Sequence, residues 1–237
     1  MESEYKYKIE LHAHTMDSSS CGKIESSELV DKYKQAGYSG LVITDHFLYY
    51  PTLGDGKNFY CYEKYDEFLK QSQRGYFLAK KRADEIGFKV YYGIELRFVG
   101  SFNDFLVYGL TPQIMYNDDM YELFKNSLDS FLPLKQKYGL AIFQAHPTRS
   151  RGHCVPQFSD TLDGYEVYNK SFQNVDESEN EQARVICEQQ GKIAIGGTDA
   201  HYKNHFAIGG IIAKYLPENE AELVKMLKDK NNFIIIK

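Results

Sequence analysis

The sequence predicts an α/β fold with a mainly parallel sheet, and three observations lead to this prediction. Short apolar runs alternate with longer amphipathic segments, as strands alternate with crossover helices in parallel sheets. The run at 40–43 is apolar throughout, which is typical of a strand covered by helices on both faces. Five of the runs lead into a residue type that binds metal. A barrel brings five strand ends to one place more readily than an open sheet does, so we expect a barrel.

A single domain is expected over residues 1–237, because this length is ample for one core and neither a repeat nor a linker is evident. Hydrophobic residues make up 43% and charged residues 26%, as in folded globular proteins. The chain shows no signal-like N-terminal segment, no membrane-length apolar run and no CxxC pair among its four cysteines. We therefore expect a cytoplasmic protein with reduced thiols and no membrane partner. The net charge of −5 argues against nucleic-acid binding through a broad basic surface.

Four strands and two helices are expected in the first half of the chain. Ser26 or Ser27 can cap a helix that Gly37 ends. A longer helix is expected at about 63–86, ended by Gly87, with Gly75 as a point where it can break. The strands are expected at 9–11, 40–43, 89–95 and 105–108, and loops at 17–22 and 47–62. The last two of these strands form either an antiparallel pair or a crossover.

The second half begins with a helix predicted at 118–138, which Pro133 interrupts and Gly139 ends. An irregular segment at 148–163 is long for a loop, and long loops in compact domains are often functional. The remaining elements are expected as strands at 140–145, 162–168, 192–196, 209–213 and 233–236 and as helices at 177–190 and 218–228.

Metal-binding residue types gather at the predicted strand ends. His12 and His14 are two residues apart at the end of the first strand, so both imidazoles project to one face. The others are His46, Glu95, His146, Asp199 and His201. Each cluster alone has an ordinary explanation, such as a helix cap or a satisfied buried acid. Together they predict a metal centre, because acids and imidazoles are costly to bury unless paired or coordinated.

Two further residues are catalytic candidates. Arg149 follows His146 closely and offers a planar guanidinium to phosphate oxygens, although an exposed arginine after Pro147 is the structural alternative. His153 either lines the pocket as a general acid or faces solvent, and the same alternatives hold for His205.

Several polar residues can either complete a metal shell or support turns and the core. They are Asp17, Ser19, Ser20, Cys21 and Asp104. A small buried thiol is the favoured state of Cys21. Glu166 and Asn169 are candidates for orienting the ligand imidazoles.

The ordered set of motifs resembles the polymerase and histidinol phosphatase (PHP) superfamily. The motifs are His12-x-His14, Thr44-Asp45-His46, Gly93-Ile94-Glu95, His146-Pro147-x-Arg149 and Thr198-Asp199-Ala200-His201. The resemblance covers nearly the whole chain. It implies a distorted, TIM-like (β/α)7 barrel with two or three divalent metal ions at the carboxyl ends of its strands.

The resemblance also implies how the ligands are shared. By analogy with the family, the first ion is held by His12, His14, Glu95 and Asp199. Glu95 bridges to a second ion that His146 also binds, and His46 and His201 hold a third.

This chain departs from the family at two places. Many members have Asp or His in the loop after His-x-His, where this chain has Ser19, Ser20 and Cys21. Many also have a His near the strand after the glutamate, where Leu106 or Thr111 stands here and Asp104 is the candidate replacement.

Several cations in one pocket suit a phosphate ester better than an amide, because its ground and transition states carry multiple negative charges. We therefore expect a metal-dependent phosphoesterase that hydrolyses a small phosphorylated substrate, most simply a phosphomonoester, through a hydroxide bridging two ions. Arg149 neutralises phosphate oxygens in this scheme, and a histidine protonates the leaving alkoxide. Zinc, manganese and iron all suit mixed imidazole and carboxylate shells. The alternatives are a phosphodiesterase or nuclease, and a non-catalytic metal-binding regulatory module.

Overall fold

The computed structural model describes residues 4–48, 65–120, 123–171 and 176–237. Its strands are β1 Tyr7–Glu10, β2 Gly40–Ile43, β3 His46–Leu48, β4 Lys89–Arg97, β5 Asp104–Tyr108, β6 Ala141–Gln144, β7 Gly164–Asn169, β8 Ile193–Gly197, β9 Ile211–Ala213 and β10 Phe233–Ile235. Its α-helices are α1 Ser26–Gln35, α2 Tyr65–Ile86, α3 Leu132–Tyr138, α4 Glu177–Gln189 and α5 Glu220–Leu227. None of the helices in these described ranges combines the length and apolarity needed to cross a bilayer.

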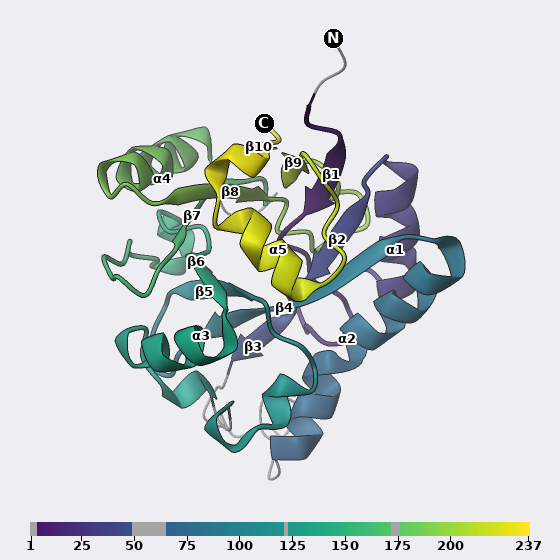
Figure 1. Ribbon diagram of the computed structural model, residues 1–237, viewed down its shortest axis with the longest axis horizontal. Helices are drawn as coiled ribbons and strands as arrows, with labels where there is room; N and C mark the ends of the chain where they lie inside the picture. Colours follow the sequence, from purple (N-terminus) through teal and green to yellow (C-terminus); the bar gives the residue numbers. More distant parts are fainter. Residues whose placement is uncertain (1–3, 49–64, 121–122, 172–175) are drawn as a thin grey trace.

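The strands form one sheet that curves into a nearly closed barrel (Figure 1). The order is β10-β9-β1-β2-β4-β5-β6-β7-β8, with β3 paired beside β4. Pairing is parallel from β1 to β4 and from β6 to β8, whereas β5 runs antiparallel to both of its neighbours. The predicted distorted TIM-like α/β barrel is therefore confirmed, and 89–97 and 104–108 form an antiparallel pair rather than a crossover.

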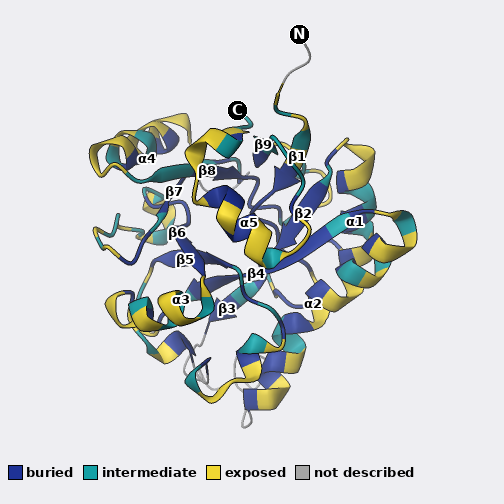
Figure 2. Ribbon diagram, in the orientation of Figure 1, coloured by how far each residue is buried: buried dark blue, intermediate teal, exposed yellow. Residues whose placement is uncertain are grey.

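Alternation along the strands separates an inner from an outer apolar layer. In β2, Leu41 and Ile43 pack outward against α1 and α2, whereas Val42 points to the inner cluster, because successive side chains project to opposite faces. Leu223 and Leu227 of α5 join that inner cluster. In Figure 2 the central strands are buried and the helices keep an exposed stripe on their outer side.

Helix α5 covers the amino ends of the strands. The Tyr91 hydroxyl near the start of β4 donates to the carbonyl of Pro217, 2.6 Å away, just before this helix. Glu218 pairs with Lys89, the first residue of β4, at 2.5 Å. This end of the barrel is therefore filled by apolar packing, which leaves the carboxyl ends of the strands for polar chemistry.

The prediction of a single helix at 118–138 is wrong. Three short 3-10 turns precede α3, which is only 7 residues long. Pro133 lies in the first turn of α3, where a missing N–H group removes no helical hydrogen bond. The buried residues Met120, Phe124 and Phe131 come from the irregular turns, so the apolar pattern reflects core contacts rather than one helical stripe.

Two other predictions need adjustment in this half of the barrel. Part of the loop expected at 47–62 belongs to β3, and 49–62 lies outside the described residues. Gly75 does not break α2, which continues without interruption through its 22 residues.

Candidate metal centre

The predicted ligands all lie at the carboxyl edge of the parallel strands. Ala13 and Ala200 form an isolated parallel bridge, which aligns the chain after β1 with the chain after β8. Because side chains alternate along extended chain, the residues flanking this bridge point to the opposite side from the two alanines. The flanking residues are His12, His14, Asp199 and His201, and this arrangement brings residues nearly two hundred positions apart into one cluster.

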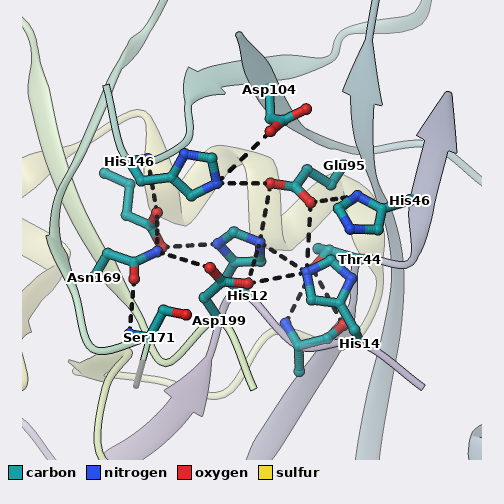
Figure 3. A network of polar contacts seen from close by, with 12 residues as sticks. His12, His14, Thr44, His46, Glu95, Asp104, His146, Asn169, Ser171 and Asp199 are labelled. Atoms are coloured by element: carbon teal, nitrogen blue, oxygen red, sulfur yellow. Dashed lines mark hydrogen bonds and ion pairs between the residues drawn. The ribbon is translucent and has the colours of Figure 1, made fainter. Parts of the chain in front are cut away.

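Figure 3 shows how closely the donor atoms approach one another. His12 Nε2 lies 3.1 Å from His14 Nε2 and 3.3 Å from Glu95 Oε1. Asp199 Oδ1 lies 3.4 Å from His12 Nε2 and 3.2 Å from His14 Nε2. His146 Nε2 is 3.0 Å from Glu95 Oε1. Glu95 therefore stands between the imidazoles.

Three overlapping groups of donors have ligand atoms within 4.8 Å of one another. They are His12, His14 and Asp199; His12, Glu95 and His146; and His14, Cys21, His46 and His201. Five of the seven histidines in the sequence belong to these groups. All seven residues predicted as ligands are thus brought together, and Cys21 joins them.

Buried polar atoms in the cluster show that its residues fit divalent cations. In the described part of the chain, Glu95 Oε2, His14 Nδ1 and His46 Nδ1 are buried without a hydrogen-bond partner. Glu95 Oε2 and His46 Nδ1 are only 2.7 Å apart. Unpaired buried acceptors are costly, and a shared cation compensates them. Nitrogen and oxygen donors at this density match the ligands of zinc, manganese and iron.

Charges within the cluster oppose the effect of burial on its acids. Burial raises the pKa of Asp199, but the neighbouring His12 and His201 bring it well below the usual value. The pKa of Glu95 is lowered in the same sense by His46 and His12. Burial, together with His201 and His46, lowers the pKa of His14 well below its usual value. The acids are therefore anionic and His14 is neutral, the forms that bind metal. Against the effect of burial, Asp199 raises the pKa of His201 to about 10 and Glu95 contributes to raising that of His146 to about 9, so a bound cation would displace protons from these two rings.

A second set of residues orients the donors. Glu166 Oε1 lies 3.0 Å from His12 Nδ1, and its Oε2 accepts from the His146 backbone N–H at 3.0 Å. Asn169 donates to Glu166 Oε2 at 2.8 Å and contacts Asp199 at 3.4 Å. Glu166 and Asn169 therefore contact the candidate ligands as the sequence predicts.

Glu10 was missed as an organising residue, although an acid inside the first apolar run was a signal for it. Its carboxylate accepts from the backbone N–H groups of Leu11, His12 and Thr198, at 3.0, 3.0 and 2.8 Å. It also accepts from the hydroxyls of Tyr33 and Thr198. Glu10 therefore ties the end of β1 to the end of β8.

The polar residues after His14 have different roles. Asp45 accepts from Thr15 and from the Ser19 hydroxyl, each at 2.7 Å, so Ser19 supports the loop. Asp17 accepts from Ser26 at the start of α1. Ser20 is exposed.

Cys21 is not the fully buried thiol that we expected, because it is partly accessible at the cavity. Its Sγ lies 3.2 Å from His201 Nε2. Burial raises the pKa of this thiol, but His46 and His201 lower it overall to about 6.

The cluster opens into a cavity of about 300 Å³ whose lining includes Arg97, Arg149 and Arg151. Arg149 is 13% exposed and lies 3.4 Å from Asp104 and 3.9 Å from Asp199. Asp104 also accepts from the Nε and Nη2 groups of Arg97, each at 2.6 Å. Asp104 thus holds two guanidinium groups at the cavity, and its Oδ2 is 3.9 Å from His146.

The two remaining histidines are outside the three donor groups. His153 is exposed, and its ring packs against Phe102 with 5.7 Å between centroids. His205 is half-buried and its backbone N–H donates to Tyr202. Neither lines the cavity.

Two ligand candidates have strained backbones. His146 has φ 28° and Asp199 has φ 55°, in the left-handed region that favours glycine. Such strain costs on the order of 1 kcal/mol or more and is concentrated at functional sites.

Comparisons with solved structures agree with this fold. The chain matches a two-domain protein from Bacteroides vulgatus that contains a predicted PHP-like metal-dependent phosphoesterase, with a TM-score of 0.65 and 16% sequence identity. The match covers 98% of this chain and 65% of that chain. A candidate metal-dependent phosphoesterase from Bifidobacterium adolescentis matches with TM-score 0.52, 15% identity, 83% of this chain and 88% of that one. An amidohydrolase from Chromobacterium violaceum, with bound sulfate and no metal, matches with TM-score 0.51, 14% identity and coverages of 82% and 87%. This chain therefore spans less than two thirds of the Bacteroides protein.

No curated protein matches the chain significantly. The family model of the PHP domain matches residues 10–227, a span that includes every ligand candidate described above. On this evidence, the chain belongs to the PHP domain family.

Proposed function

We propose that this protein is a metal-dependent phosphoesterase that hydrolyses a phosphomonoester of a small molecule. The observation that carries the proposal is the overlap of three donor groups beside an arginine-lined cavity. The PHP domain match and the phosphoesterases named among the structural neighbours support the same reaction class.

We assign His12, His14, Glu95 and Asp199 to one ion and Glu95 with His146 to a second, and His46 with His201 to a third. When bound, the ions supply Lewis acidity to the phosphoryl group and lower the pKa of water. Glu95 is suited to the bridging position because each of its oxygens faces different imidazoles, Oε1 facing His12 and His146 and Oε2 facing His14 and His46.

Arg149 binds the substrate phosphate in this proposal. Its guanidinium lies between Asp104 and Asp199 and lines the cavity, so its donors are held at the mouth of the cluster. A planar fork suits phosphate oxygens, and its fixed charge binds them in the substrate and in the transition state alike. His153 has no part in the proposal, because it is exposed and outside the cavity lining.

The size of the cavity favours a small substrate. A volume of about 300 Å³ is at the lower end of ligand pockets, and the chain carries a net charge of −5. Both features favour a small phosphate ester over a polynucleotide.

The test is phosphate release from p-nitrophenyl phosphate and a panel of sugar and nucleoside monophosphates, after loading with Mn²⁺, Zn²⁺ or Fe²⁺. We expect His12→Ala to lose both metal and activity. Arg149→Ala should keep its metal and lose roughly 10- to 100-fold in kcat/KM, mainly through KM, because a charged hydrogen bond contributes about 1.5–3 kcal/mol. Arg184→Ala is the matched control, since the Arg184 side chain on α4 is 42% exposed and pairs with Glu181 and Glu188.

Two results would overturn the proposal. Turnover of bis(p-nitrophenyl) phosphate without turnover of any monoester would indicate a phosphodiesterase. Full metal occupancy with no turnover of any phosphoester would indicate a metal-binding module instead.

A further inference from the structure

A thiol lies among the imidazoles at one edge of the metal cluster. Cys21 belongs to the donor group with His14, His46 and His201, and its Sγ is 3.2 Å from His201 Nε2. The other two donor groups contain only nitrogen and oxygen donors. This difference in donor chemistry is the basis of the inference.

The loop that carries Cys21 is firmly held. The N–H groups of Ser19 and Gly22 donate to the carbonyls of Thr15 and Ser19, at 2.9 and 3.1 Å. Lys23 donates to the carbonyl of His201 at 2.8 Å, which joins this loop to the segment bearing the imidazole. A Cβ atom at Gly22 would lie only 2.5 Å from the Thr15 carbonyl, so the loop packs closely against the chain before it. The position of the sulfur is therefore set by the fold.

In its neutral form, the histidine opposite the sulfur presents a lone pair to it. His201 Nδ1 lies 2.9 Å from the carbonyl oxygen of Asp199, which can only accept, so Nδ1 carries the proton in the neutral ring. Its Nε2, facing Cys21, is then an acceptor.

A second observation points to a cation at His46, a member of this donor group. The Glu95 side chain is 1% exposed, its Oε2 has no hydrogen-bond partner in the described part of the chain, and this oxygen lies 2.7 Å from the unpartnered Nδ1 of His46. A cation bound by His46 beside Glu95 compensates these two buried atoms.

We propose that Cys21 binds a metal ion as a thiolate, together with His46 and His201, and makes this position selective for zinc over manganese. A thiolate is a soft ligand that favours Zn²⁺, whereas the nitrogen and oxygen donors of the other groups also suit Mn²⁺. The cluster then contains two kinds of metal site, one with a sulfur ligand and the others with only nitrogen and oxygen ligands. The proposal depends on the metal centre of the proposed function but not on hydrolysis of any substrate.

The direct test is spectroscopic. The protein loaded with Co²⁺ should show a sulfur-to-cobalt charge-transfer band in the near ultraviolet. The zinc-loaded protein should show, by X-ray absorption, one sulfur at about 2.3 Å among lighter donors at about 2.0–2.1 Å. Both signals report the ligand without any assay of activity.

Variants then identify the thiol. Cys21→Ser should abolish the band and the zinc–sulfur distance and should weaken zinc binding at this position by at least roughly 10- to 100-fold. Cys21→His, which supplies a nitrogen ligand instead, should retain the ion while losing both sulfur signals. Retention in Cys21→His also decides the matter if Cys21→Ser fails to fold.

The other cysteines provide matched controls. Cys154 is the alternative sulfur, because its Sγ is 3.8 Å from His146 Nδ1. Cys187 lies in α4 with its Sγ 3.3 Å from the Lys192 carbonyl, and Cys61 is outside the described residues. Replacing any of these three by Ser should leave both signals intact. The proposal fails if the signals survive in Cys21→Ser, if they vanish in one of the control variants, or if zinc shows no sulfur neighbour. Absence of phosphoester turnover, by contrast, would contradict only the proposed function.

Discussion

The candidate ligands His12 and His146 depend on a neighbour that the ligand motifs do not contain. His12 is an example, because its Nδ1 faces Glu166 while its Nε2 faces the other donors. A carboxylate on one ring nitrogen fixes the tautomer and makes the opposite nitrogen a better donor to metal. Glu166 also accepts from the backbone of His146, so one acid positions two ligands from different strands.

Glu166→Gln tests this dependence at the residue scale. The amide can accept on one side only, and its NH2 group opposes the donors of His146 or Asn169 on the other side. We expect metal affinity, measured by chelator competition, to fall by roughly 10- to 100-fold. Glu188→Gln on the exposed face of α4 should bind metal as the unmodified protein does. An unchanged affinity in Glu166→Gln would show that the orientation of His12 comes from packing alone.

At the scale of elements, helix α2 is fitted to the ligand-bearing loop through Gly75. The Ser18 hydroxyl accepts from the Gly75 N–H at 2.7 Å. A Cβ atom at Gly75 would lie 2.1 Å from Thr15 Oγ1 and 2.4 Å from Asp45 Oδ2. The helix therefore approaches the loop as closely as it does because this position has no side chain.

Gly75→Ala should consequently destabilise the protein, whereas replacing glycine by alanine inside a helix ordinarily stabilises it. Helix propensity alone favours alanine by about 1 kcal/mol. Overpacking costs about 1–3 kcal/mol, and the displaced atoms belong to short side chains that have little room to move. We expect a net loss of up to about 2 kcal/mol, seen as a melting temperature lower by up to roughly 8 °C. Lys81→Ala on the exposed face of α2 is the control, with an effect within about 0.5 kcal/mol. A more stable Gly75→Ala protein would contradict the close fit.

On the scale of the whole molecule, the barrel closes by backbone packing at one seam. A Cβ atom at Gly209 would lie 2.4 Å from the carbonyl of Gly197, and one at Gly197 would lie 2.6 Å from the Cβ of His12. The end of β8 therefore packs directly against the segment before β9 and against the first ligand. The residues that pack at this seam therefore include His12 of the metal cluster.

Metal binding should for this reason stabilise the entire fold. The cluster joins Glu95 within β4 to residues that follow β1, β2, β6 and β8. A cation bound only by the folded chain stabilises it by about 2.7 kcal/mol at a concentration 100 times its dissociation constant. We expect Zn²⁺ or Mn²⁺ added to chelator-treated protein to raise the melting temperature by roughly 5–10 °C. Asp199→Asn should show a much smaller rise. If the unmodified protein shows no rise with either ion, the cluster does not bind cations in the folded state.

Local pattern was sufficient for much of the fold and for the identity of the ligands. The strand at 40–43 follows from an uninterrupted apolar run, and the pairing of His12 with His14 follows from side-chain alternation. Both are properties of a few neighbouring residues. The same reasoning failed at 118–138, because its apolar residues serve contacts with distant parts of the core.

The sequence by itself determined the α/β alternation, the strand ends that carry donors, and the family resemblance. Only the tertiary structure decided that Cys21 lies beside His201, that Asp104 at the start of the antiparallel β5 holds two arginines, and that His153 is exposed and outside the cavity lining. These facts depend on strand direction and on contacts between residues far apart in the chain. Spacing along the sequence carries no information about such contacts until the barrel closes.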